Sequence, residues 1–104
     1  MNKVSKEMAE KLLGNVAPER CFWLSDGQAL NNLSDLDKSL KGMKKEVFQH
    51  HVNKEKNDFA NWIKDIVGDE ELSKKAAASK TKAAVERVVK ARVAELSKAA
   101  KAKQ

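Results

Sequence analysis

The residues of this sequence that could perform chemistry are one cysteine, Cys21, the adjacent histidines His50 and His51, and Asp58. They suggest a zinc site or a Cys–His nucleophile pair. Zinc needs ligands on one side of the ion, at spacings such as Cys-x2-Cys or His-x3-His, whereas adjacent histidines on a helix diverge by ~100°. The spacing therefore argues against a metal. We expect one histidine to pack beside Val52 and the other to face solvent.

Nucleophilic catalysis is not indicated by the surroundings of the cysteine. A catalytic cysteine needs a lowered pKa, from a helix N-terminus or a paired imidazolium. Cys21 instead precedes Phe22 and Trp23 in an apolar run, where cysteine behaves as a small hydrophobe. The sequence also has no Gly-x-Ser-x-Gly, P-loop or Gly-x-Gly-x-x-Gly motif. We predict a non-enzymatic protein without metal or cofactor, in which Cys21 is a buried, unligated thiol.

Length and composition predict one small, mainly α-helical protein. The 104 residues suffice for one core. One proline and four glycines are too few for an all-β sandwich with many turns. The single cysteine excludes an internal disulfide and fits a reducing compartment. No apolar run approaches the ~20 residues that span a bilayer, and the first residues lack the apolar segment of a signal peptide. We therefore expect a cytoplasmic protein with no membrane partner.

Apolar periodicity predicts five or six helices and a minimal β-hairpin. The expected elements are a helix over residues 2–14 with Val4, Met8 and Leu12 inward, a hairpin near 22–30, helices over 32–42 and 44–51, a helix that starts after Asn53 or Asn57 and ends at Gly68, and a long basic C-terminal helix. The Asn- and Asp-rich segment 53–58 is either a recognition loop or cap and turn chemistry, and we favour caps.

The clearest helical pattern surrounds Trp62. Its apolar residues recur at i, i+3, i+4, i+7 and i+8, and they are Phe59, Trp62, Ile63, Ile66 and Val67. We expect this face to pack against Leu33, Leu36, Leu40 and Phe48. Trp62 is then a core residue, and Trp23, beside the Asp-Gly turn, is the more exposed of the two tryptophans.

Two stretches of the middle segment carry a family resemblance. Residues 22–27 read Phe-Trp-Leu-Ser-Asp-Gly, and residues 51–63 read His-Val-Asn-Lys-Glu-Lys-Asn-Asp-Phe-Ala-Asn-Trp-Ile, with Gly-Asp following at 68–69. This pattern resembles an uncharacterised domain family that is common in archaea and found in some bacteria. The resemblance covers residues 18–75 and implies one folding unit there, but it implies no activity or ligand. It divides the chain into an N-terminal helix (1–17), a globular part (18–75) and an Ala/Lys-rich basic helix (76–104).

Positive charge is concentrated toward the C-terminus. Residues 73–104 contain ten basic and two acidic residues, Glu86 and Glu95, whereas residues 1–72 contain eleven basic and thirteen acidic ones. The net charge of +6 is therefore a surplus of eight positive charges on a slightly acidic body. Such asymmetry indicates an anionic partner or a solvated basic arm.

Two hypotheses follow from the C-terminal helix, whose basic residues and aliphatic residues occupy opposite sides at ~100° per residue. The first is non-specific binding of DNA or RNA phosphates, because the helix has no aromatic side chain for stacking on bases. Its candidate contact residues are Lys74, Lys75, Lys80, Lys82, Arg87, Lys90, Arg92, Lys98, Lys101 and Lys103. The alternative is a protein–protein or homo-oligomer contact through an aliphatic seam, which comprises Val85, Val89, Val93 and Leu96.

Overall fold

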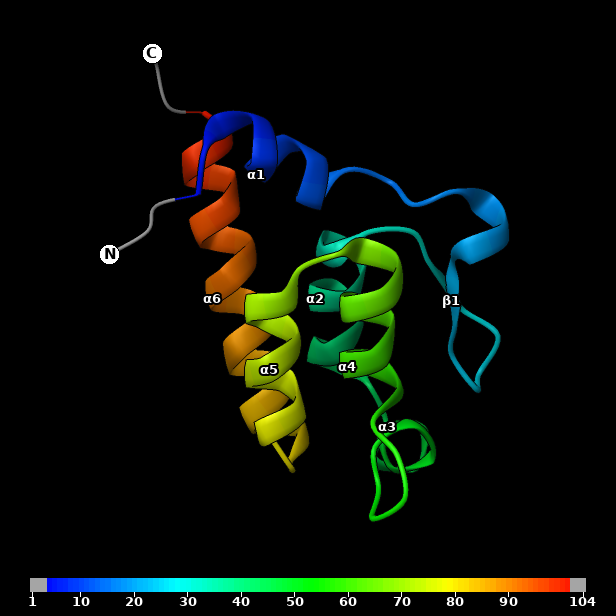
Figure 1. Cartoon of the computed structure of the whole chain (residues 1–104). Helices are drawn as coiled ribbons and strands as arrows, with labels where there is room; N and C mark the ends of the chain where they lie inside the picture. Colours follow the sequence, from blue (N-terminus) through cyan, green and yellow to red (C-terminus); the bar gives the residue numbers. More distant parts are fainter. Residues whose placement is uncertain (1–3, 102–104) are drawn as a thin grey trace.

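Helices dominate the computed structural model, which describes residues 4–101 (Figure 1). The elements in chain order are α1 (Lys6–Leu13), the 3-10 turn η1 (Pro18–Arg20), β1 (Phe22–Trp23), β2 (Ala29–Leu30), α2 (Leu33–Gly42), α3 (Lys45–His51), α4 (Asp58–Trp62), the π-helical turn η2 (Ile63–Val67), α5 (Glu70–Ala78) and α6 (Lys82–Ala100). The prediction of five or six helices with a hairpin near residues 22–30 and a long C-terminal helix is confirmed.

Side-chain caps fix where most of the helices begin. Ser5, Asn32, Asn57, Asp69 and Thr81 each accept a backbone N–H from the first turn of α1, α2, α4, α5 and α6 in that order. Each cap satisfies one of the N–H groups that a helix start leaves without a partner. The segment 53–58 uses its amides in the same way, because Asn53 accepts the N–H of Glu55 and donates to the carbonyl of Gln49.

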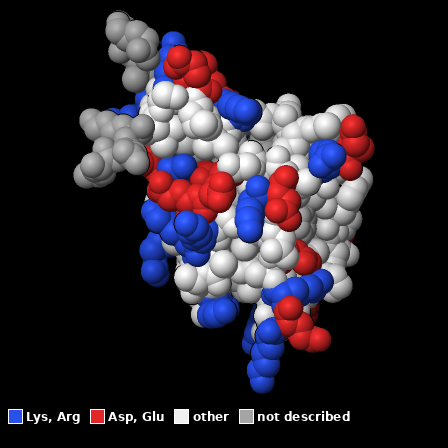
Figure 2. Space-filling view, in the orientation of Figure 1, with Lys and Arg blue, Asp and Glu red and all other residues white. Residues whose placement is uncertain are grey.

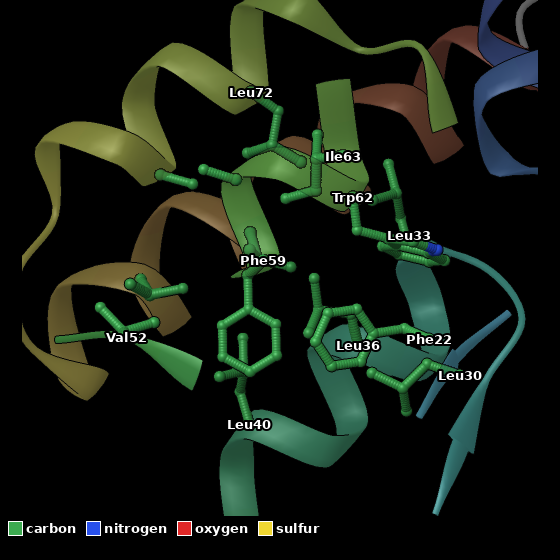
Figure 3. Close-up of a cluster of buried hydrophobic side chains, with 14 of the residues drawn as sticks. Phe22, Leu30, Leu33, Leu36, Leu40, Val52, Phe59, Trp62, Ile63 and Leu72 are labelled. Carbon is green, nitrogen blue, oxygen red and sulfur yellow. The ribbon is translucent and has the colours of Figure 1, made fainter. Parts of the chain in front are cut away.

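The core lies between α2 and α4, as expected. Phe59 and Ile63 are fully buried, as are the three leucines of α2, and Trp62 is 6% exposed. Figure 3 shows these side chains pointing toward one another around the ring of Phe59. Ile66 was expected in this face but is only partly buried. The reason is η2, in which the N–H of Gly68 bonds to the carbonyl of Ile63, five residues back, so the wider turn rotates Ile66 toward the edge.

The hairpin packs on this core through one of its two faces. Phe22 pairs with Leu30, and its ring stacks on Phe59 with 5.1 Å between centroids. Because strand side chains alternate between faces, Trp23 points away and is 65% exposed, as expected. Cys21 shares that outward side and is only half-buried, so the prediction of a buried thiol is wrong.

Helix α1 lies across the C-terminal part of α6 (Figure 1). The prediction that Val4, Met8 and Leu12 form the buried face of α1 is wrong for Met8. This side chain is 49% exposed, whereas Ala9 and Leu12 are buried. The contact therefore follows Ala9 and Leu12 at i and i+3 rather than a spacing of four.

Candidate nucleic-acid interface

The aliphatic seam of α6 is covered by the chain's own helices. Val85, Val89 and Leu96 are fully buried, and Val93 packs against the same core. Helix α6 contacts α1, α2 and α5, so these helices occupy the side that a second copy would need. This corrects the expectation that the seam offers a surface for a homo-oligomer. Its burial also holds α6 in a fixed orientation on the rest of the domain.

The opposite side of α6 presents basic residues to solvent. Arg87, Lys90, Lys98 and Lys101, which we call the α6 ridge, are all exposed. They follow one face of the helix over about 20 Å at 1.5 Å per residue. Within residues 4–101, none of the four forms an ion pair. The ridge therefore keeps its full positive charge toward solvent.

The two acidic residues of α6 are directed to other cations. Glu86 lies 3.6 Å from Lys82, and Glu95 lies 2.9 Å from Arg92. On α5, Lys75 lies 3.5 Å from Glu71. Figure 2 accordingly shows acidic side chains among the basic ones on the face formed by α5 and α6. Within the described part of the C-terminal segment, fewer basic residues than the sequence indicated are thus without an acidic partner, and four of them form the ridge.

Arg92 was predicted to contact nucleic acid, and the structure corrects this. Its side chain is 7% exposed, and its Nε and Nη2 atoms bind the two carboxylate oxygens of Asp69 at 2.8 and 3.0 Å. Its Nη1 also bonds to Glu95. Burial lowers the pKa of Arg92, but the hydrogen bonds that its guanidinium donates to Asp69 and Glu95 outweigh this effect and raise the pKa above its ordinary value. Arg92 therefore joins α6 to α5 and is not accessible to a phosphate.

The remaining predicted contacts fall into three groups. Lys74 is exposed on α5, beside the ion-paired Lys75. Lys103 lies outside the described residues.

Lys80 and Lys82 line a cavity of about 580 Å³ between α3 and the start of α6, together with Lys45. Lys45 was not among the predicted contacts. Only the fold brings α3 beside residues 80–83, and no periodicity in the sequence connects these two segments.

The histidines adopt the expected arrangement, with His50 exposed and His51 buried. The Nε2 of His51 accepts the backbone N–H of Ser25 at 3.0 Å, and its Nδ1 lies 3.0 Å from Asp58. Both ring nitrogens are thus engaged, and His51 connects the hairpin to α3 and α4. Among residues 4–101, no three His, Cys, Asp or Glu side chains are grouped closely enough to hold a metal ion.

The fold shifts the titration of Asp58, the carboxylate beside His51. Burial raises the pKa of Asp58, but hydrogen bonds from His51 and Lys56 outweigh this effect. Lys56 Nζ lies 2.9 Å from the same carboxylate oxygen. The pKa of Asp58 therefore lies below its ordinary value, and the carboxylate stays ionised as a structural partner of His51.

Comparisons with protein-family models, curated proteins and solved structures found no match to this chain. The resemblance to an uncharacterised archaeal family consequently stays a prediction. Among residues 4–101, each helix is too short or too polar to cross a membrane.

Proposed function

We propose that this protein binds nucleic acid without sequence preference through the α6 ridge. The observation that carries the proposal is the set of four exposed cations on one helix face, with no ion pair within the described residues. Lys and Arg side chains arranged in this way neutralise phosphates and release counterions. Phosphate contacts position a protein on nucleic acid but carry no base information.

The side chains around the ridge support non-specific binding. Ala83 and Ala94 are exposed on the same face, so small side chains separate the cations and leave the helix surface open to a phosphate backbone. The ridge has no Asn, Gln or aromatic residue. Those residue types read base edges or stack on bases. The exposed tryptophan, Trp23, belongs to the hairpin, which Figure 1 places on the far side of the domain from α6.

A salt titration tests this proposal. If the four ridge residues neutralise about four phosphates, the affinity for a DNA duplex should fall by about two orders of magnitude between ~50 and ~200 mM salt, linearly on a log–log plot. Duplexes of unrelated sequence should bind about equally. Replacing Arg87, Lys90, Lys98 and Lys101 together by Gln should abolish binding. Helicity should persist, since Gln is nearly as good a helix former as Lys.

A matched variant controls for net charge. Lys38, Lys41, Lys54 and Lys64 are exposed on α2, the α3–α4 loop and η2, and their replacement by Gln removes the same four charges. We expect this variant to keep its affinity within a few-fold, because the removed charges are not on α6. Equal losses in both variants, or a ridge variant that binds like the wild type, would contradict the proposal.

A further inference from the structure

The groove between α3 and the start of α6, which we call the α3–α6 groove, combines an apolar lining with positive charge. Its apolar wall consists of Phe48 from α3, Val52 directly after α3, and Met43 at the end of α2. The facing wall is residues 80–83. With a volume of about 580 Å³, the groove falls in the range of small-molecule sites.

Every ionisable side chain that lines the groove is a lysine. Lys45 comes from α3, whereas Lys80 and Lys82 come from the segment that leads into α6. Lys82 also lies 3.6 Å from Glu86, so the positive charge of the groove that has no acidic partner among the described residues comes from Lys45 and Lys80. Gln49 and Thr81 add polar side chains at the lining. Three other cavities of the described chain each have an Asp or Glu in their lining. The α3–α6 groove is thus suited to an anionic ligand with an apolar part.

The groove is continuous with the α6 ridge. Ala83 lines the groove and precedes Arg87 by four residues, so the two lie one above the other on the exposed face of α6. A phosphate backbone that follows the ridge toward the start of α6 therefore reaches the groove without changing direction.

We propose that the α3–α6 groove receives one unstacked nucleotide of a single strand whose backbone follows the ridge. The base lies against the apolar wall, and Lys45, Lys80 and Lys82 contact the adjoining phosphates. This inference rests on the proposed function and narrows it to single-stranded nucleic acid. A duplex keeps its bases paired and stacked inside a sugar–phosphate shell, whereas the bases of a single strand can turn outward. Duplexes bind the ridge alone.

The test compares single and double strands on the full chain by fluorescence anisotropy. The probes are a labelled oligothymidylate of about 16 nucleotides and a duplex of equal length, at one salt concentration. We expect the wild type to bind the single strand about tenfold more tightly than the duplex, because one base of the single strand is additionally buried in the groove. The variant Lys45→Gln/Lys80→Gln removes charge, and Gln49→Trp, on the α3 side of the groove and away from the ridge, fills it. Both should reduce single-strand affinity to the duplex value and leave duplex affinity within about twofold.

Matched controls separate the groove from the surface around it. Lys41→Gln/Lys44→Gln removes two exposed lysines near the start of α3 that do not line the groove, and Ala77→Trp adds the same bulk on α5. Both controls should retain the tenfold preference. Circular dichroism of each variant confirms that it is folded.

The outcomes distinguish this inference from the function on which it rests. Equal binding of both probes, abolished by the ridge variant, would overturn the groove proposal and leave non-specific binding intact. No binding of either probe at low salt would overturn both. A third probe, a peptide of alternating Glu and Leu, tests a protein ligand. Three results together would show that the groove takes an acidic polypeptide and that the nucleotide proposal is wrong. The peptide binds the wild type, its affinity falls in Lys45→Gln/Lys80→Gln, and oligothymidylate does not displace it.

Discussion

The guanidinium of Arg92 binds both carboxylate oxygens of Asp69, with Nε–Oδ2 and Nη2–Oδ1 distances of 2.8 and 3.0 Å. Asp69 is 2% exposed, and its Oδ1 also accepts the N–H of Leu72 as the cap of α5. One carboxylate therefore starts α5 and holds α6 beside it. This pair helps to hold α6 in place, and both of its residues are buried.

Loss of one partner of this pair should destabilise the fold strongly. Asp69→Ala should lower the free energy of unfolding by about 3–5 kcal/mol, because it leaves a buried cation without its main partner. Arg92→Lys should also destabilise, since an ammonium cannot reproduce the two-point contact of a guanidinium. Chemical denaturation followed by circular dichroism measures both effects. Lys90→Gln on the exposed face is the control and should change the free energy by less than about 0.5 kcal/mol.

A mild effect of Asp69→Ala would contradict the assignment of Arg92 as a structural residue. The same purified variants also address binding. In conditions where Arg92→Lys remains folded, its duplex affinity should match the wild type, because the α6 ridge is unchanged.

Local patterns in the sequence were sufficient to predict most of the helices and much of the core, although they did not separate α5 (Glu70–Ala78) from α6. Asn32 and Asn57 cap helices as their positions indicated, and Gly68 ends η2 with a φ of 89°. Trp62 lies in the core and Trp23 at the surface for the reasons that periodicity and turn chemistry supply. These features depend on residues close together in the chain, which is the information that a single sequence holds.

Long-range partners could not be predicted from the same patterns. Arg92 looked like one more cation of the basic helix, because its acid partner Asp69 lies 23 residues earlier. The α3–α6 groove likewise needs Lys45 beside Lys80, and no local spacing links these two residues. The position of Ile66 was missed for a different reason, since its displacement arises from a π-helical turn that apolar periodicity does not encode.

The two tryptophans should respond very differently to truncation. Trp62→Ala should destabilise by about 3–5 kcal/mol, because it removes a large buried side chain. It also removes the hydrogen bond from the indole N–H to the carbonyl of Arg20. Trp23→Ala is the matched control and should change stability by less than about 0.5 kcal/mol. Equilibrium denaturation of both variants decides this. Similar midpoints for the two variants would show that the core is assigned wrongly.

The seam residues should stabilise the monomer rather than an assembly. Leu96→Ala should lower the free energy of unfolding by about 2–5 kcal/mol, as expected for a fully buried leucine. The unfolding midpoint of the wild type should not change with protein concentration, because the seam residues are already buried within one chain. A midpoint that rises with concentration, and that loses this dependence in Leu96→Ala, would instead place the seam between two copies.

The stability of the fold should decrease in acid through Asp58. Its pKa in the folded protein lies below the ordinary value of 3.8. The folded state therefore favours the deprotonated carboxylate. The resulting stabilisation is complete when the pH is above the ordinary pKa, and it is lost as the pH falls through the lower pKa of the folded state. Between about pH 5 and about pH 2, the wild type should lose more unfolding free energy than Asp58→Asn, which has no carboxylate to protonate. Asp65→Asn, on the exposed surface of η2, is the control and should follow the wild-type curve. Parallel curves for Asp58→Asn and the wild type would show that the contacts of Asp58 with His51 and Lys56 contribute nothing to folding.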